Sequence, residues 1–168
     1  MKLRRVINGQ KVVTDWGVWK TGDKKMPKSA YPLSKNAFTL PSAYTWRVVL
    51  FECLGQSFRL LIAFRTDLSR YQSHLGIDVG GDTVTLARYE FHSGEPGWHI
   101  HCRCDDTGCV PGTMACNDKR FPHPASFHSE MEFGTMDQTA AFERAVRIFR
   151  LRKAIPPAFD LEMQDGRS

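Results

Sequence analysis

The sequence predicts an α+β fold in which an antiparallel β-meander of about five strands is packed by one C-terminal amphipathic helix. Successive short segments alternate apolar and polar residues, turn-forming residues separate them, and a late segment has helical periodicity. Of the 168 residues, 42% are hydrophobic and 24% are charged, which is typical of one folded domain. We therefore expect a single domain over residues 1–168.

The first 42 residues are expected to form an irregular arm. They are rich in Lys, Gly, Pro and Ser and show no sustained helical or strand period. The arm nevertheless carries isolated aromatic residues at Trp16, Trp19, Tyr31 and Phe38. Because a disordered segment rarely carries so many aromatics, we expect the arm to pack across the domain.

The antiparallel sheet is predicted over residues 43–104. The segments with strand character are 44–52, 57–65, 71–79, 83–92 and 98–104. Short runs that contain Gly55, Gly80 or Gly94 separate them, and such runs are typical of hairpin turns. Residues 78–82 fit a hairpin turn better than a phosphate-binding glycine loop, so no nucleotide cofactor is expected.

The last third of the chain is predicted to hold a loop, a helix and a tail. Residues 105–134 are rich in Cys, His, Gly and Pro. So long a loop in a compact domain is usually functional or held in place by a link such as a bound metal. A helix is predicted over 135–153, with Thr135 as its N-cap. Its apolar residues recur at helical spacing and should cover one face of the sheet: Phe142, Ala145, Val146 and Phe149. Residues 158–168 are expected to be a mobile tail.

Two neighbouring strands carry the residues best suited to chemistry. Alternation along strand 98–104 places Trp98 and Ile100 on the apolar face. The opposite, polar face takes His99, His101 and Arg103 from this strand and Arg88, Glu90 and His92 from strand 83–92. A four-residue turn at 94–97 would then pair His92 with His99, Glu90 with His101, and Arg88 with Arg103. One apolar face and one titratable face would result.

That polar face contains the groups that cleavage of RNA requires without a metal. His99 and His101 are the candidate base and acid, and Glu90 would fix a tautomer. Arg88 and Arg103 would bind phosphate, and the 2′-hydroxyl would be the nucleophile. His92 and the loop residue His128 could complete the site. The alternative is an exposed polar sheet face without chemistry.

Four cysteines lie within fifteen residues, at Cys102, Cys104, Cys109 and Cys116. This density suits a closed tetrahedral zinc site, which would be structural and would pin the long loop. If the strand instead runs through Cys104, then Cys102 and Cys104 are small core residues. A mixed site that keeps a water ligand and uses His99, His101 or His128 would be hydrolytic.

The charge balance favours a polyanionic partner. The chain has 23 Lys and Arg against 18 Asp and Glu, a net charge of +5. Arg144, Arg147 and Arg150 on the predicted helix offer a surface for nucleic acid, RNA more than DNA, or for an acidic protein partner. A solvated helix face whose cations complement the dipole is the alternative. Without a signal peptide or an apolar run of ~20 residues, we expect a cytoplasmic location and no membrane partner.

The order of a meander, a Trp98-His99-Ile100-His101 strand, a His-containing loop and a final amphipathic helix resembles small uncharacterised toxin-like proteins of prokaryotic toxin–antitoxin and defence loci. The resemblance covers residues 57–152 and does not include the cysteine cluster or the arm. It implies an RNA-cleaving or otherwise inhibitory activity that a partner protein neutralises. The expected function is thus an RNA-directed endoribonuclease. The alternatives are a non-enzymatic, zinc-stabilised module that binds nucleic acid or a protein, and a metal-dependent hydrolase.

Overall fold

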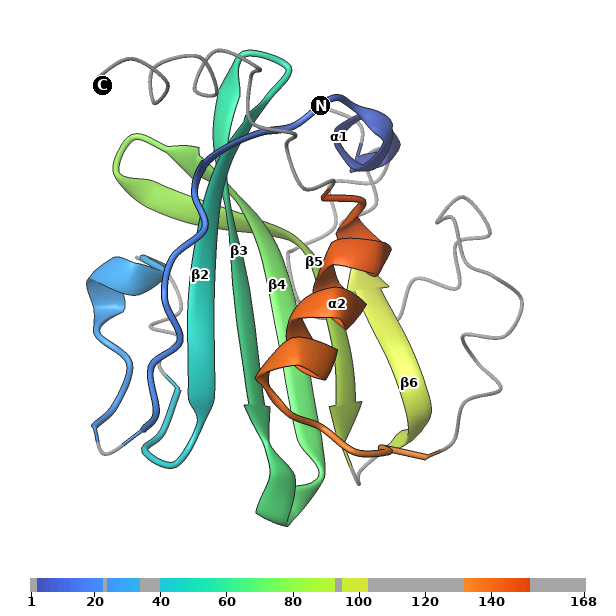
Figure 1. Ribbon diagram of the computed structural model, residues 1–168. Coiled ribbons are helices and arrows are strands. Elements are labelled where there is room, and N and C mark those ends of the chain that lie inside the picture. Colours follow the sequence, from blue (N-terminus) through green and yellow to red (C-terminus); the bar gives the residue numbers. More distant parts are fainter. Residues whose placement is uncertain (1–2, 23, 34–39, 93–94, 103–131, 152–168) are drawn as a thin grey trace, which may run out of the picture.

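The structure, a computed structural model, describes residues 3–22, 24–33, 40–92, 95–102 and 132–151. These residues form a six-stranded antiparallel sheet in which every strand pairs with its neighbours in the chain, so the sheet is a meander (Figure 1). The strands are β1 (Val12–Asp15), β2 (Thr45–Cys53), β3 (Gln56–Arg65), β4 (Arg70–Val79), β5 (Asp82–His92) and β6 (Glu95–Cys102). The helices are α1 (Leu3–Asn8) and α2 (Gln138–Phe149), with short 3-10 turns η1 (Lys28–Ala30) and η2 (Thr66–Leu68).

The predicted meander and its C-terminal helix are confirmed. β2 to β6 correspond to the five predicted strands, each shifted by at most a few residues at its ends. The arm differs from the irregular course expected, because it contains α1 and β1. Both are too short for a sequence period to be visible, and β1 depends on β2, against which it pairs Val13 with Phe51. The single-domain organisation stays a prediction.

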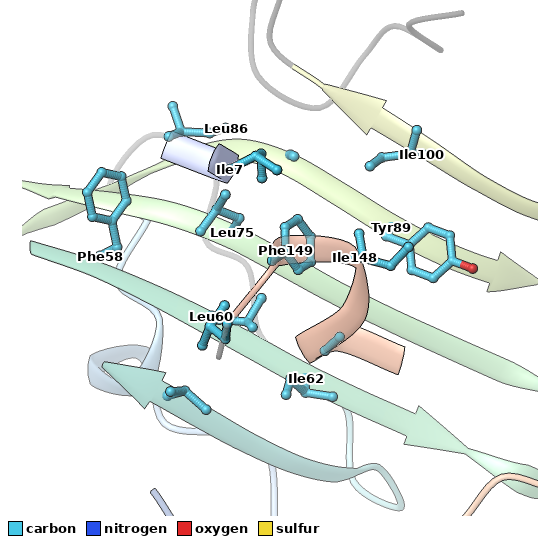
Figure 2. Close-up of a cluster of buried hydrophobic side chains, with 14 of the residues drawn as sticks. Ile7, Phe58, Leu60, Ile62, Leu75, Leu86, Tyr89, Ile100, Ile148 and Phe149 are labelled. Carbon is cyan, nitrogen blue, oxygen red and sulfur yellow. The ribbon is translucent and has the colours of Figure 1, made fainter. Parts of the chain in front are cut away.

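Helix α2 lies across one face of the sheet, with α1 beside its C-terminal end (Figure 1). Figure 2 shows Ile148 and Phe149 of α2 above Leu60 and Ile62 of β3, with Ile7 of α1 near the same cluster. Phe149 is completely buried. Burial of an aromatic side chain of this size contributes roughly 2–3 kcal/mol, so this face holds the main core.

The ends of α2 differ from the prediction. Asp137 rather than Thr135 is the N-cap, since its side chain accepts a hydrogen bond of 2.7 Å from the amide of Ala140. The helix ends at Phe149, because Arg150 takes the left-handed conformation with φ of 51°. Of the predicted apolar stripe, Ala145 and Phe149 are buried, whereas Phe142 and Val146 are half-buried at its edge.

The opposite face of the sheet is divided into an apolar half and a polar half. Over β2 and β3 the arm covers it, with Tyr31 and Met26 buried against Leu61 and Ala63. These described residues of the arm thus pack against this half of the sheet. Directly paired residues in a sheet share a face, and two rows of pairs continue this face from β3 to β6. The first row is Leu61, His74, Arg88 and His101. The second row is Ala63, Gln72, Glu90 and His99. The polar half therefore lies on β4, β5 and β6.

Candidate functional site

The pairing of β5 with β6 sets which polar side chains meet. The structure pairs Arg88 with His101, Glu90 with His99, and His92 with Glu95. The predicted register is therefore wrong by two residues at Arg88 and Glu90 and by four at His92. β6 begins at Glu95, inside the turn predicted at 94–97, and a bulge lies between Glu90 and His92. Because a shift by an even number of residues keeps every side chain on its face, the predicted division into an apolar and a polar face is still correct.

Glu90 lies at the centre of five polar side chains, which we call the histidine cluster: Arg88, Glu90, His92, His99 and His101. Its Oε1 atom is 2.9 Å from Nη2 of Arg88 and 2.9 Å from Nε2 of His101. Nε2 of His99 is 3.3 Å away, and Nε2 of His92 is 3.9 Å away. The Glu90 side chain is only 9% exposed. A carboxylate buried to this degree needs cationic or donor partners, because an unpaired buried charge costs several kcal/mol.

The other face of the same hairpin fixes these side chains in place. Trp98 and Ile100 on β6 are buried in the main core together with Tyr89 on β5. The rings of Tyr89 and Trp98 stack with their centroids 5.2 Å apart. The apolar residues thus anchor both strands, and the polar residues between them must project to the opposite face.

The tautomer of His99 follows from a contact with the backbone. Its Nδ1 atom lies 3.1 Å from the carbonyl oxygen of Gly97. A carbonyl oxygen can only accept, so Nδ1 carries the proton, and Nε2 of the neutral ring presents a lone pair. This Nε2 atom lies 3.3 Å from Oε1 of Glu90. A neutral Nε2 atom and a carboxylate oxygen at this distance repel each other, so a metal cation bound by both atoms would stabilise the arrangement.

Glu90, His99 and His101 could hold a metal ion. One ligand atom from each lies within 4.8 Å of the other two. Ligand bonds of about 2.0–2.1 Å place neighbouring ligand atoms about 3.3 Å apart in a tetrahedron and about 2.9 Å apart in an octahedron. The observed separations of 3.3 and 2.9 Å from Oε1 to the two Nε2 atoms fit these values. The Nδ1 contact of His99 is also the kind of second contact that metal-binding histidines make.

The absence of a hydrogen bond between Oε1 of Glu90 and the described residues agrees with binding of a metal ion. Oε1 forms no hydrogen bond to any residue in the described ranges, although Nε2 of His101 is 2.9 Å away. The two atoms are close without the alignment that a hydrogen bond needs. Ligand atoms around a shared cation point toward the cation rather than toward one another. Two imidazoles and a carboxylate are ligands typical of zinc and of other divalent transition metals, and three protein ligands leave room for a further one.

A pocket of about 330 Å³ adjoins the histidine cluster. Its lining comes from β4, β5 and the residue that precedes β2: Tyr44, Arg70, Tyr71, Gln72, Arg88, Glu90, Phe91 and His92. Arg88, Glu90 and His92 thus belong to both the cluster and the pocket. A substrate group in this pocket would lie beside the candidate metal ligands.

His74 lies next to the cluster, although no pattern in the sequence marks it as a site residue. It pairs with Arg88 across β4 and β5 and is 3% exposed. Burial, with a smaller effect from Arg88, lowers the pKa of His74 to about 3. The ring is therefore neutral near pH 7, and its Nε2 atom lies 3.1 Å from Oε1 of Gln72. Its position under the arm depends on tertiary packing, which no local pattern reveals.

Several predicted site residues fall outside the described ranges. These are Arg103, Cys104, Cys109, Cys116 and His128. β6 ends at Cys102, whose side chain is also outside what the structure describes. The zinc site of four cysteines therefore stays a prediction. Cys53 is free and buried in the main core.

The three helix arginines have different surroundings. The guanidinium of Arg144 lies 3.8 Å from the centroid of the Trp98 ring, on the core side of the sheet. Arg150 donates a hydrogen bond of 2.7 Å to the side chain of Asn8. Arg147 is exposed. Arg144 thus packs α2 against the sheet, and the nucleic-acid surface on these three residues stays a prediction.

Comparison with protein-family models, with curated proteins and with solved structures finds no match to this chain. No helix within the described ranges is long and apolar enough to cross a membrane. The function must therefore be argued from the chemistry of the histidine cluster and the pocket beside it.

Proposed function

We propose that this protein is a metal-dependent endoribonuclease whose active centre is the histidine cluster. In this proposal Glu90, His99 and His101 bind a divalent ion of the zinc class. The observation that carries it is the approach of the two Nε2 atoms to Oε1 of Glu90 at 2.9 and 3.3 Å, without hydrogen-bond alignment at Oε1. The fixed tautomer of His99 supports the same assignment.

Metal binding would change the roles predicted for His99 and His101, which were base and acid. His99 and His101 place their Nε2 atoms 3.3 and 2.9 Å from Oε1 of Glu90, so they are better placed as ligands than as the base and acid. His92 lines the pocket and its side chain is 31% exposed, which suits proton exchange with a substrate. Arg88 can stabilise the charge that develops on a phosphoryl group. A bound divalent ion would polarise a phosphoryl oxygen.

The proposed reaction is transesterification of the RNA backbone. The 2′-oxygen attacks the neighbouring phosphorus while its proton passes to His92. The bond between phosphorus and the 5′-oxygen breaks, and that oxygen takes up a proton from water, while His92 returns the proton it accepted to the solvent. The products are a 2′,3′-cyclic phosphate and a 5′-hydroxyl. DNA lacks the nucleophile, so the proposal includes selectivity for RNA.

The first test compares two substitutions that remove the same charge. Glu90→Gln takes a ligand from the proposed centre, whereas Glu143→Gln changes an exposed residue of α2. We expect the wild type and Glu143→Gln to bind about one divalent ion per chain and to cleave RNA, and Glu90→Gln to lose both properties. Elemental analysis and a gel assay with RNA and its 2′-deoxy analogue measure this. Cleavage that persists after chelation and in Glu90→Gln would rule out the proposal.

A second candidate function is a zinc-stabilised module that binds nucleic acid or a protein without turnover. The low exposure of the ligands favours it, since the side chains of His99 and His101 are 13% and 11% exposed. A metal at this place would join β5 to β6. Chelation separates the candidates. Removal of a structural ion should unfold the domain, whereas removal of a catalytic ion should abolish cleavage with less loss of structure. Circular dichroism and the RNA assay, recorded on the same chelated sample, read out both effects.

The toxin-like role implied by the resemblance belongs to the same proposal. An RNA-cleaving toxin should arrest the growth of a bacterial host when it is expressed without its partner. We expect the wild type and Glu143→Gln to do so and Glu90→Gln to be tolerated at equal expression. Equal growth with all three proteins would argue against a toxin.

A further inference from the structure

We infer that the pocket beside the histidine cluster is an anion subsite that takes a phosphate group of the RNA substrate, with Arg70 and Arg88 as its cationic donors. The inference rests on the proposed function for the identity of the substrate. The subsite itself is argued from the lining of the pocket.

The floor of the pocket is the polar half of the sheet. Gln72 on β4 pairs with Glu90 on β5, and the pair of Tyr71 with Phe91 comes next along the two strands. Arg70, one residue further on, therefore lies near His92 at the end of β5. The pocket runs from the candidate metal ligands to Arg70, along a path that a nucleotide backbone could follow.

Arg70 differs from the other arginines on this side of the sheet. Arg59 is paired with Asp78 at 2.7 Å, and Arg65 is paired with Asp67 at 2.8 Å. Among the described residues, no carboxylate lies within ion-pair distance of Arg70, which is exposed at the start of β4. Its guanidinium can therefore pair with an anion from outside without breaking an internal ion pair.

Arg88 is the second arginine in the lining of the pocket. Its Nη2 atom contacts Glu90, but its buried Nε atom forms no hydrogen bond with any residue that the structure describes. Arg88 lines the pocket and its side chain is 29% exposed, so an anion in the pocket can approach its guanidinium. The planar guanidinium matches the spacing of two phosphate oxygens.

The remaining lining adds a neutral donor and a net positive charge. Oε1 of Gln72 contacts His74, which leaves the amide NH₂ group available as a donor. Two arginines against Glu90 alone give the lining a formal charge of +1 with neutral His92. The volume of about 330 Å³ lies at the small end of ordinary ligand pockets, which fits a single phosphate with part of its sugar.

The test measures binding of inorganic phosphate to the full chain as purified, by calorimetry at low and at physiological salt. Arg70→Gln is compared with Arg4→Gln, which removes the same charge from an exposed position on α1. We expect Arg70→Gln to weaken phosphate binding about tenfold or more, as the loss of a charge-assisted contact does. Arg4→Gln should change it less than about twofold, and thermal melts should show both variants folded.

Kinetics with RNA separate this inference from the proposed function. If RNA is cleaved, Arg70→Gln should raise KM about tenfold with little change in kcat, and Arg4→Gln should match the wild type. Equal effects of the two variants on phosphate binding, or no phosphate binding by the wild type, would overturn the subsite and leave the nuclease proposal standing. Selective loss of phosphate binding in Arg70→Gln, with no cleavage by any protein, would support the subsite and overturn the nuclease.

Discussion

Acid should destabilise this protein through His74, and the effect can be isolated with one substitution. His74 is 3% exposed, and its ring meets the ring of Tyr31 edge-on with centroids 5.9 Å apart. Its pKa falls from 6.5 to about 3 on folding, mainly because burial disfavours the charged ring and secondarily because Arg88 is near. The unfolded chain therefore binds a proton between about pH 6.5 and pH 3, and the folded chain does not.

The sign and size of the effect follow from this difference. The contribution of neutral His74 is fully present above pH 6.5, and it is lost as the pH falls toward 3. Each pH unit inside this window lowers the free energy of unfolding by about 1.4 kcal/mol. Between pH 7 and pH 4.5 the expected loss is about 2–3 kcal/mol, a large part of the stability of a domain of this size.

His74→Phe keeps a flat ring at this position and removes the titrating group. The assay is urea unfolding of the wild type and the variant at pH 7 and pH 4.5. Other groups titrate in both proteins, so they cancel when the two acid losses are subtracted. We expect the wild type to lose about 2–3 kcal/mol more than His74→Phe. An equal loss in the two proteins would refute the assignment of His74 as a buried neutral base.

Three further predictions concern helix α2. Asp137→Ala removes the acceptor for the amide of Ala140 and should lower the free energy of unfolding by about 1 kcal/mol; an unchanged urea midpoint would mean that the cap is not formed. Arg144→Gln removes the cation from the face of Trp98 and should cost about 1–2 kcal/mol, with a change in tryptophan fluorescence. If Arg144 instead only contacts solvent, neither should change. Phe149→Ala leaves a cavity in the core and should cost about 3–5 kcal/mol by the same assay, and a cost below 1 kcal/mol would contradict its complete burial.

The order of strands and the identity of their faces could be predicted from the sequence. The alternation of apolar and polar residues is a local property. Short glycine-containing turns place consecutive strands side by side, so these strands pair. The segments 44–52 and 83–92 were therefore placed within a residue or two of β2 and β5. The same alternation placed His99 and His101 on the face of Glu90, opposite Trp98.

The register at the hairpin could not be predicted in the same way. It depends on where the turn begins and on a bulge between Glu90 and His92, and both are decided by how the strands pack. The shift in register changed the partners on the polar face and placed His101 beside Arg88. It did not change which residues share that face.

The sequence by itself determined the meander, the C-terminal helix and the set of polar residues from which a site could be built, because these depend on the period of neighbouring side chains. Only the tertiary structure decided that Glu90 is buried among three histidines, that a backbone carbonyl fixes the tautomer of His99, and that Arg70 and Arg88 line one pocket. The physical reason is that burial, tautomer and pocket depend on residues far apart in the chain, and these meet only when the strands and the arm have packed together.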